Sequence, residues 1–276
     1  MAVRIVTDSS AGLPPEIVEE LDITVVDLHV LTREVKDSIE TTTSGLSTLE
    51  LVAAYARQLE RGGDDGVVAL HVPGALSSTE SSAIAAAAVF DGLVEVVQTS
   101  TVGMAIGAAA MAAAKCAQQG EDLASCAETA RATLARAVTW VYLHKIDDIR
   151  RGGRLSTGQA MLSAATLATK PIMQVTDGRL ELVGKTRTQT KAFTKLVELV
   201  AERADHQPAF VAIQHNDAPV AAEDLRDLLD DVLTAETSFM VIPMSEALAV
   251  HAGTGAVGVS AVFAAESVDN SESDGD

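Results

Sequence analysis

Aromatic side chains and cations are scarce in this chain. Only 3% of its 276 residues are aromatic, and 20 Lys and Arg stand against 39 Asp and Glu, a formal net charge of −19. Proteins that bind single-stranded nucleic acid use aromatic stacking platforms on a cationic groove, and a strongly acidic surface repels polyanions. The composition therefore argues against nucleic acid as a partner and against stable binding to an anionic membrane.

Cysteines and long apolar runs are also few. The two cysteines, Cys116 and Cys126, have no C-x-x-C spacing, so a disulfide framework is not expected. The longest weakly polar run, 102–114, has 13 residues, whereas a membrane-spanning helix needs about 20. The N-terminus shows no apolar region typical of a signal peptide. We expect a soluble, cytoplasmic protein with reduced thiols.

Familiar catalytic signatures are absent. The sequence contains no G-x-x-x-x-G-K-[ST] phosphate loop, no H-E-x-x-H and no G-x-S-x-G. Its six histidines lack metal-ligand spacing, so we expect neither a metal nor a cofactor. His251 stands out because it opens "HAGTGAVG", whose glycines permit a close backbone approach. The alternative for His251 is a simple turn before the last strand.

Ala, Val and Leu supply most of the 47% hydrophobic residues, and they fall in alternating strand and helix patterns over the first half of the chain. Short β-branched runs begin near residues 3, 22, 66 and 94, with "TWVYL" as a fifth, and helical stretches separate them. Such alternation predicts an α/β fold with a mostly parallel sheet covered by helices on both faces. We assign residues 1–150 to this N-terminal domain.

The pattern changes after about residue 145. Two β-prone runs flank Asp177-Gly178, which predicts a hairpin, and an amphipathic helix is expected over about 189–203. Further strands and helices follow in mixed order, so residues 151–265 are assigned to a C-terminal α+β domain. Residues 266–276 contain acids and no cation and are expected to form a disordered tail.

Charge is distributed unevenly along the chain. Residues 144–195 hold ten basic and four acidic residues, a balance of +6 against −25 for the remainder. This segment is either a solvated basic face or a surface for an anionic ligand or partner. We expect it to be a docking surface, so charge reversal at Arg150 and Arg151 should slow the step that depends on docking.

Hydroxyl groups recur where predicted strands end, at residues 9–10, 42–44, 77–79 and 99–101. Each group is explained singly as a helix cap. Because ligands bind at the carboxyl ends of strands in α/β sheets, the four together predict a ring of donors for a carboxylate or phosphate. We expect Ser77 to contact the ligand, and Ser78 and Thr79 mainly to cap the following helix.

Six motifs, in this order, resemble the DegV family of bacterial fatty-acid-binding proteins over about residues 3–263. They are "IVTDSSAGLP", "TTSGLS", "LSSTESSA", "IRRGGRLS", "ATKPIMQVTDGRLELVGKTRT" and "HAGTGAVG". The resemblance implies a two-domain fold that encloses a fatty acid and is not itself an enzyme. It also implies a separate ATP-dependent fatty acid kinase as partner, which phosphorylates the bound acid for phospholipid synthesis.

Carried over by position, the resemblance implies carboxylate contacts from Thr43 and Ser77, with His251 in the same hydrogen-bond network. Ser44, Ser78 and Arg154 are expected to support the head group. The tunnel candidates, for which an ordinary core position is the alternative, are Met161, Leu162, Ile172, Met173 and Phe263. Transient contact with a membrane surface is expected during delivery.

Two other functions remain open at this point. One is a small-molecule kinase or phosphotransferase on a related sheet, with His251 and the hydroxyl loops acting on phosphate. The other is a regulatory protein that senses lipid without engaging a kinase. A protein that hydrolyses ATP alone would favour the first. A protein that binds acyl chains but engages no kinase would favour the second.

Overall fold

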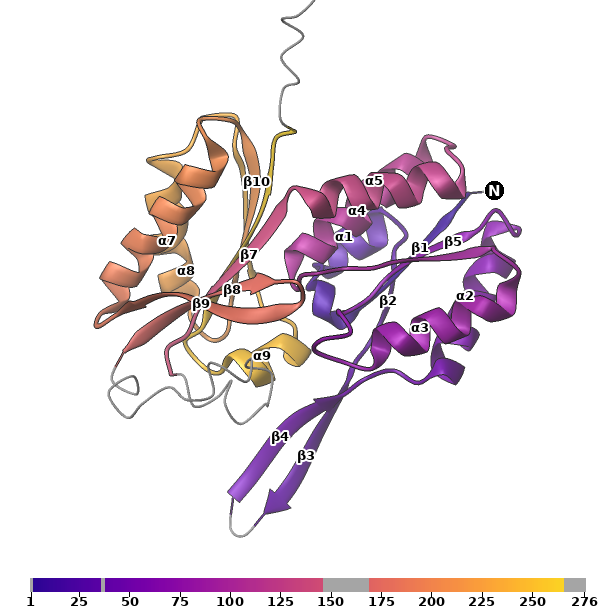
Figure 1. Cartoon of the computed structure of the whole chain (residues 1–276), viewed down its shortest axis with the longest axis horizontal. Helices are drawn as coiled ribbons and strands as arrows, with labels where there is room; N and C mark the ends of the chain where they lie inside the picture. The colour runs from indigo at the N-terminus through magenta and orange to yellow at the C-terminus, as the bar shows by residue number, and fades with distance from the viewer. Residues whose placement is uncertain (1, 36–37, 146–168, 266–276) are drawn as a thin grey trace, which may run out of the picture.

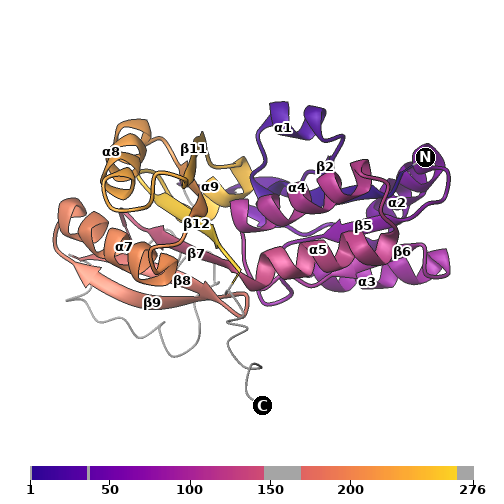
Figure 2. The ribbon, with the colours of Figure 1, turned by 90° about the horizontal axis from the view of Figure 1, so that it is seen from above.

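The structure, a computed structural model, describes residues 2–35, 38–145 and 169–265. Within these ranges the chain forms two sheets with their own helices and one projecting hairpin (Figure 1). Figure 2 shows the two sheets side by side, the first under indigo and magenta helices and the second under orange ones. The predicted combination of a parallel α/β sheet and a mixed sheet is confirmed.

Four parallel strands form the first sheet, in the order β2-β1-β5-β6. Successive side chains alternate between its faces: Ile5 packs toward α4 and α5, and Val6 toward α2 and α3. Helices on both faces explain why the central strand β5, VVAL, is apolar throughout and fully buried. The strands are β1 (Arg4–Asp8), β2 (Thr24–Val26), β5 (Val67–Leu70) and β6 (Val94–Val97). The helices are η1 (Ser9–Ala11), α1 (Pro15–Glu20), α2 (Thr48–Gly62), α3 (Thr79–Ala87), η2 (Ala88–Phe90), α4 (Met104–Gln118) and α5 (Leu123–Ala135).

An antiparallel hairpin, β3 (His29–Val35) and β4 (Ser38–Ser44), projects from the first sheet (Figure 1). The sequence had suggested one continuous strand from residue 22 and a hydroxyl-rich helix cap from Thr43. Both interpretations were wrong. Thr43 ends a strand, and α2 begins five residues later, with a reciprocal capping box between Ser47 and Glu50. Threonine serves in caps and strands alike, so the Thr-rich run did not distinguish them.

Six strands form the second sheet, in the order β11-β10-β12-β7-β8-β9. Only the β10–β11 pair is parallel; the other neighbours are antiparallel. The strands are β7 (Ala137–Tyr142), β8 (Lys170–Thr176), β9 (Arg179–Thr186), β10 (Ala209–His215), β11 (Ser238–Pro243) and β12 (Val257–Phe263). Helices α7 (Gln189–Ala204) and α8 (Pro219–Asp230) pack on one face, while α9 (Glu246–Ala252) lies toward the first sheet (Figure 2).

Strand β7 belongs to a different sheet from the one expected. "TWVYL" was expected as a fifth strand of the first sheet, but β7 pairs with β12 and β8 inside the second. A strand that follows a helix reads locally as the next strand of a parallel sheet, and the pattern does not say which sheet it joins. Trp140 and Tyr142 belong to the core under α7 and α8, which fixes β7 there. The second sheet therefore draws on residues before the boundary placed at 150.

The hairpin predicted at Asp177-Gly178 is confirmed as β8–β9. Both turn residues have positive φ, 48° and 70°, as a two-residue type I′ turn requires. The amphipathic helix expected over 189–203 is α7. No helix within residues 2–35, 38–145 and 169–265 is long and apolar enough to cross a membrane. The expected tail, 266–276, lies outside the described residues.

Candidate functional site

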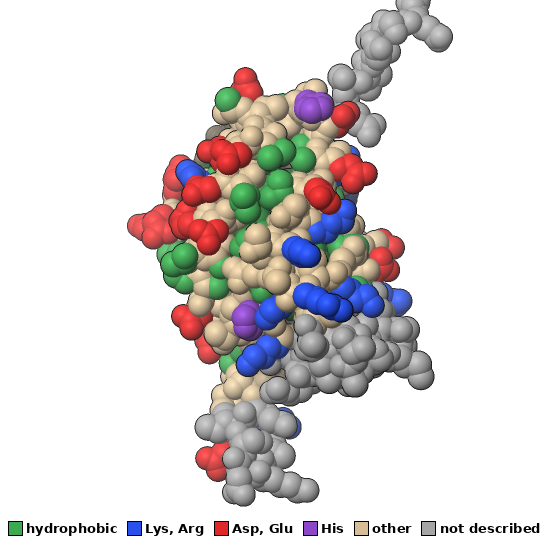
Figure 3. Space-filling view, turned by 90° about the vertical axis from the view of Figure 1, so that its left-hand side faces the viewer, with side chains coloured by type: hydrophobic (Ala, Val, Ile, Leu, Met, Phe, Trp, Pro, Cys, Tyr) green, Lys and Arg blue, Asp and Glu red, His purple; other side chains and the backbone are tan. Residues whose placement is uncertain are grey.

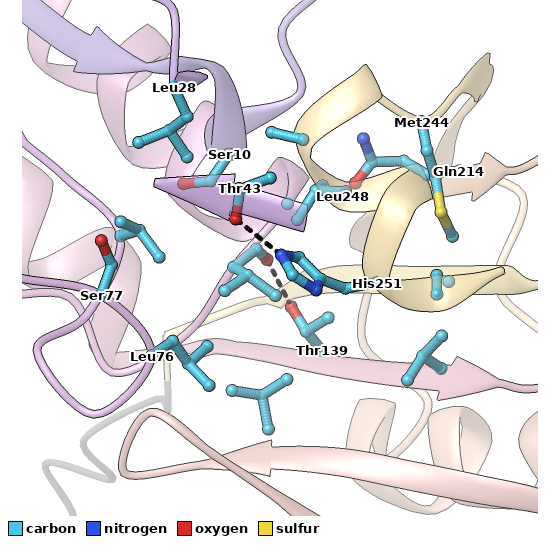
Figure 4. A pocket seen from close by; sticks show the side chains of 18 of the residues that line it. Ser10, Leu28, Thr43, Leu76, Ser77, Thr139, Gln214, Met244, Leu248 and His251 are labelled. Carbon is cyan, nitrogen blue, oxygen red and sulfur yellow. Dashed lines mark hydrogen bonds between the residues drawn. The ribbon is translucent and has the colours of Figure 1, made fainter. Parts of the chain in front are cut away.

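A largely apolar cavity lies where the carboxyl ends of the first sheet's strands face the second sheet (Figure 4). Its empty space, which includes open solvent at the mouth, is about 1000 Å³. The first sheet contributes the loops after β1, β2, β5 and β6, and the projecting hairpin contributes the end of β4. The second sheet contributes β7, β8, β9, β10 and β12, together with α9. The apolar lining includes Leu28, Val72, Leu76, Val102, Val141, Val175, Leu180, Met244 and Leu248, and the polar lining Ser10, Thr43, Ser44, Ser77, Thr139, Gln214, His251 and Ser260.

Hydroxyl groups from the predicted strand ends gather at this cavity. Ser10, Thr43 and Ser77 line it. From the fourth group, Thr101 donates its hydroxyl proton to Thr139 Oγ1, 2.9 Å away, and Thr139 lines the cavity. The position of ligand sites at strand ends therefore predicted which loops would meet.

Thr43 and His251 are joined by a hydrogen bond although 208 residues separate them. Thr43 Oγ1 lies 2.7 Å from His251 Nε2, and the pair is half-buried (Figure 4). Thr43 ends β4, and His251 stands in the last turn of α9, which packs on that strand. The imidazole therefore lies beside a hydroxyl at the cavity wall, and its tautomer decides which partner donates.

Ser77 belongs to a compact hydroxyl cluster over Gly45. Ser77 Oγ accepts from the Thr79 backbone N–H at 3.2 Å and lies 2.8 Å from Thr79 Oγ1, which itself accepts from the Leu46 N–H at 3.1 Å. With the Thr79 hydroxyl donating to Ser77, the Ser77 proton remains for a ligand. A Cβ on Gly45 would lie 2.7 Å from Ser77 Oγ, so only glycine lets the β4–α2 connection approach this closely.

The capping role expected of Ser78 and Thr79 is wrong. Ser78 occupies the N-cap position of α3, but its backbone is helical (φ −72°, ψ −4°) and its side chain makes no capping bond. A capping side chain needs an extended backbone at that residue. Thr79, fully buried, instead ties the start of α3 to the β4–α2 connection through Leu46.

A buried chain of polar groups supports the two loops beneath the cavity. The Asp8 carboxylate accepts from the backbone N–H groups of Ser10 and Val72, 2.9 and 2.8 Å away, and lies 3.1 Å from His71 Nδ1. His71 Nε2 lies 2.9 Å from the Tyr55 hydroxyl. Asp8 and His71 side chains are fully buried, and sequence reasoning assigned neither a role. The only sequence signal for Asp8 and His71 was their position, since each is a polar residue at the end of a buried strand.

These contacts shift two pKa values in opposite directions. Burial disfavours the charged form of Asp8, but the hydrogen bond and charge of His71, with the bonds from Ser10 and Val72, outweigh it and hold the pKa of Asp8 below its ordinary value. Burial, followed by the nearby Asp8 charge, raises the pKa of Tyr55. The network therefore keeps a carboxylate ionised and a phenol neutral under the sheet edge.

Only some of the other proposed site residues lie at the cavity. Ser44 lines the cavity and Ser78 is exposed beside it. Met173 packs against cavity-lining Val141 and Met244, so it backs the wall. Ile172 and Phe263 lie in the core under α7 and α8, on the opposite face of the sheet. Arg150, Arg151, Arg154, Met161 and Leu162 lie outside the described residues.

Two further features bear on chemistry. Among the residues that the structure describes, no group of three or more His, Cys, Asp or Glu is arranged to hold a metal ion. Lys and Arg side chains gather on the face formed by β9 and α7 (Figure 3), where Lys185, Arg187 and Lys191 are exposed. We call these three residues the basic face.

Comparisons with known proteins agree with this architecture. A DegV family model matches residues 2–264. A DegV domain-containing protein of Corynebacterium glutamicum is 57% identical over 265 residues, 96% of this chain and 95% of the relative. The crystal structure of a DegV family protein from C. glutamicum, 56% identical, superposes with a TM-score of 0.92 and covers 96% of this chain and 99% of its own.

For a second solved relative, the class of ligand that it binds is also known. DegV from Bacillus subtilis, described as a fatty acid binding protein, is 26% identical with a TM-score of 0.83, over 96% of this chain and all of its own (100%). That description names binding rather than catalysis. Family model, sequence identity and fold agree over nearly the whole length, and the chain therefore belongs to the DegV family.

Proposed function

We propose that this protein binds a long-chain fatty acid in the cavity and presents its carboxylate to a separate ATP-dependent kinase. The observation that carries the proposal is the convergence of Thr43, Ser77 and His251 on one largely apolar cavity. An acyl chain needs a dry tunnel, and its head group needs a few well-placed donors. The fatty acid binding of the B. subtilis relative supports the same ligand class.

The two ends of the ligand contribute differently. Burial of the tail is worth about 0.8 kcal/mol per CH₂, so a chain of 16 to 18 carbons, a length typical of the proposed ligand class, supplies affinity by itself. The head contacts fix where the carboxylate lies. Thr43 and Ser77 are the proposed donors, His251 orients Thr43, and Ser44 and Ser78 complete the rim, with Arg154 as a further candidate.

Native mass spectrometry of the purified protein tests the ligand. A bound mass of a 16- to 18-carbon acid is expected, together with loss of that mass after delipidation. An empty protein that hydrolyses ATP alone would contradict the carrier role and favour a phosphotransferase. A loaded protein that no fatty acid kinase phosphorylates would leave lipid binding intact and refute only the partnership.

Ser77→Ala separates head placement from tail burial. Loss of one hydrogen bond to a charged group costs roughly 1.5–3 kcal/mol, so fatty acid should bind about ten- to a hundred-fold more weakly. Phosphorylation of loaded protein should fall further, because a misplaced carboxylate does not meet the attacking geometry. The measurement is kinase turnover at saturating fatty acid. Normal turnover in this variant would refute the assignment of Ser77.

The basic face is the proposed docking surface for the kinase, and delivery of the acyl phosphate to phospholipid synthesis is the proposed outcome. Cationic contacts steer association and weaken with salt. The double variant Lys185→Glu, Lys191→Glu should slow phosphorylation several-fold at low salt and less at high salt, with fatty acid affinity unchanged. Lys115→Glu, at an exposed position of the otherwise largely buried α4, is the matched control. Equal slowing in the control, or none in the double variant, contradicts this docking surface.

A further inference from the structure

Two buried polar atoms in the cavity wall have no hydrogen-bond partner among the described residues. They are Ser10 Oγ and Gln214 Nε2, on residues only 1% and 3% exposed. Both residues line the cavity. An unsatisfied buried donor is unfavourable, and buried polar groups without partners in a ligand site point to the ligand.

Gln214 is held in one orientation. Its Oε1 accepts from the Met104 backbone N–H at 2.9 Å, which fixes oxygen and nitrogen because the reverse placement would set two donors against each other. Two glycines also pack closely against the side chain. A Cβ added to Gly12 would lie 2.2 Å from Nε2, and one added to Gly103 would lie 2.5 Å from Oε1, so a larger residue at either position would clash with Gln214. The amide nitrogen therefore cannot exchange places with the oxygen, and both of its hydrogens are available to a ligand.

Ser10 is held equally firmly. Its backbone N–H donates to Asp8 Oδ1 at 2.9 Å, and its carbonyl accepts from the Gly103 N–H at 2.8 Å. These bonds place the side chain at the cavity wall (Figure 4). Its hydroxyl can donate or accept.

Ser260 supplies an acceptor close to Gln214. Thr139 Oγ1 donates to the Val102 carbonyl at 3.1 Å and accepts from Thr101, so Ser260 Oγ, 3.0 Å away, must donate its own proton to Thr139. The Ser260 oxygen keeps only lone pairs for the cavity. It lies on the side of Gln214 that faces Gly103, because a Cβ on Gly103 would lie 3.4 Å from Ser260 Oγ and 2.5 Å from Gln214 Oε1.

The chemistry of these three groups selects the ligand atom. A carboxylate only accepts, and it would meet the lone pairs of Ser260. A saturated chain leaves the Gln214 amide unpaired. A hydroxyl group accepts from Gln214 and donates to Ser260 or Ser10, and so satisfies both kinds of partner. In Figure 4, Gln214 and Ser77 lie on different sides of the cavity, whereas Ser10 is drawn beside Thr43, so the subsite extends from the proposed head-group donors away from Ser77.

We infer that Ser10, Gln214 and Ser260 form a polar subsite for a hydroxyl group carried on the acyl chain, so that hydroxylated fatty acids are preferred ligands. The inference rests on the proposed function, since it assigns a subsite within the same cavity. It adds a substrate class that tail burial and carboxylate contacts do not specify.

The test is a binding series on delipidated protein with stearic acid and its 2-, 3-, 10- and 12-hydroxy derivatives. One hydroxy isomer should bind about ten-fold more tightly than stearic acid, as expected for one or two added hydrogen bonds. Ser10→Ala leaves the backbone hydrogen bonds of Ser10 to Asp8 and Gly103 in place, so it should fold, still bind stearic acid through burial of the tail, and lose much of that preference. Gln214→Met, of similar length, should lose it too; Ser10→Ala keeps the test valid if Gln214→Met does not fold.

The outcomes are distinguishable. Binding of none of the acids would refute the proposed function itself. Binding of stearic acid with no preferred hydroxy isomer would overturn the inference and leave that function standing. A preference that survives in Ser10→Ala and Gln214→Met would place its origin elsewhere and also overturn the inference. Weakened stearic acid binding in both variants would mean that these groups hold the carboxylate instead, which contradicts the hydroxyl subsite.

Discussion

At the residue scale, Asp8 shows how much of the site depends on one buried charge. Its carboxylate accepts hydrogen bonds from the loops that carry Ser10 and Val72, and it faces His71. Because the pKa of Asp8 is lowered in the folded protein, its stabilising contribution is present above the unfolded pKa of about 3.9 and is lost as the pH falls below it.

Asp8→Asn should therefore lower the free energy of unfolding at pH 7 by about 3–5 kcal/mol, as expected when one partner of a buried pair is removed. The difference from the unsubstituted protein should shrink as the pH falls from about 5 toward 3. Urea unfolding at several pH values measures both effects. Asp65→Asn, at an exposed carboxylate, is the control, and a pH-independent loss in Asp8→Asn would contradict the ionised carboxylate.

Single residues also show where sequence reasoning reached its limit. Thr43, Ser77 and His251 were selected from motifs, and the structure brings all three to one cavity. Gln214 was not selected, because its partner Met104 lies 110 residues away and nothing local marks such a bond. Ile172 and Phe263 were tunnel candidates as apolar strand residues, but apolar character alone does not tell which face of a two-sided sheet a residue occupies.

At the element scale, the α3 loop owes its position to Thr79. If Thr79 only capped the helix, Thr79→Ala would lower the free energy of unfolding by about 1 kcal/mol and leave function intact. The structure changes that expectation, because Thr79 Oγ1 accepts from the buried Leu46 N–H. Removing this acceptor should cost about 1–3 kcal/mol and also weaken fatty acid binding, since Ser77 loses a partner. Thr79→Ser should restore both, and a stability loss without any change in affinity would contradict this role.

Elements were predicted well where pattern and turn chemistry agreed. The β8–β9 hairpin and α7 followed from Asp177-Gly178 and from a 3.6-residue apolar period. The β3–β4 hairpin was missed because its threonines suit a cap as well as a strand, and β7 was given to the wrong sheet. Strand partners are chosen by long-range packing, which a local pattern does not contain.

At the scale of the whole molecule, the cavity wall is shared by both sheets, so a ligand should stabilise them together. Delipidated protein should unfold at a lower temperature than loaded protein in a scanning calorimeter. At a free fatty acid concentration 100-fold above Kd, the gain is about 2.7 kcal/mol. One shifted transition is expected. Two transitions, of which only one responds to ligand, would contradict a site built from both halves.

The hydrogen bond between Thr43 and His251 has a consequence for biosynthesis. It joins residues 208 positions apart, and domains fold in order of synthesis, N-terminal part first. The first sheet can form while the ribosome is still translating the rest, but the head-group site stays incomplete until α9 and β12 have emerged. With the proposed function, a nascent chain would therefore be unable to take up a fatty acid, and loading would be the last event in its maturation.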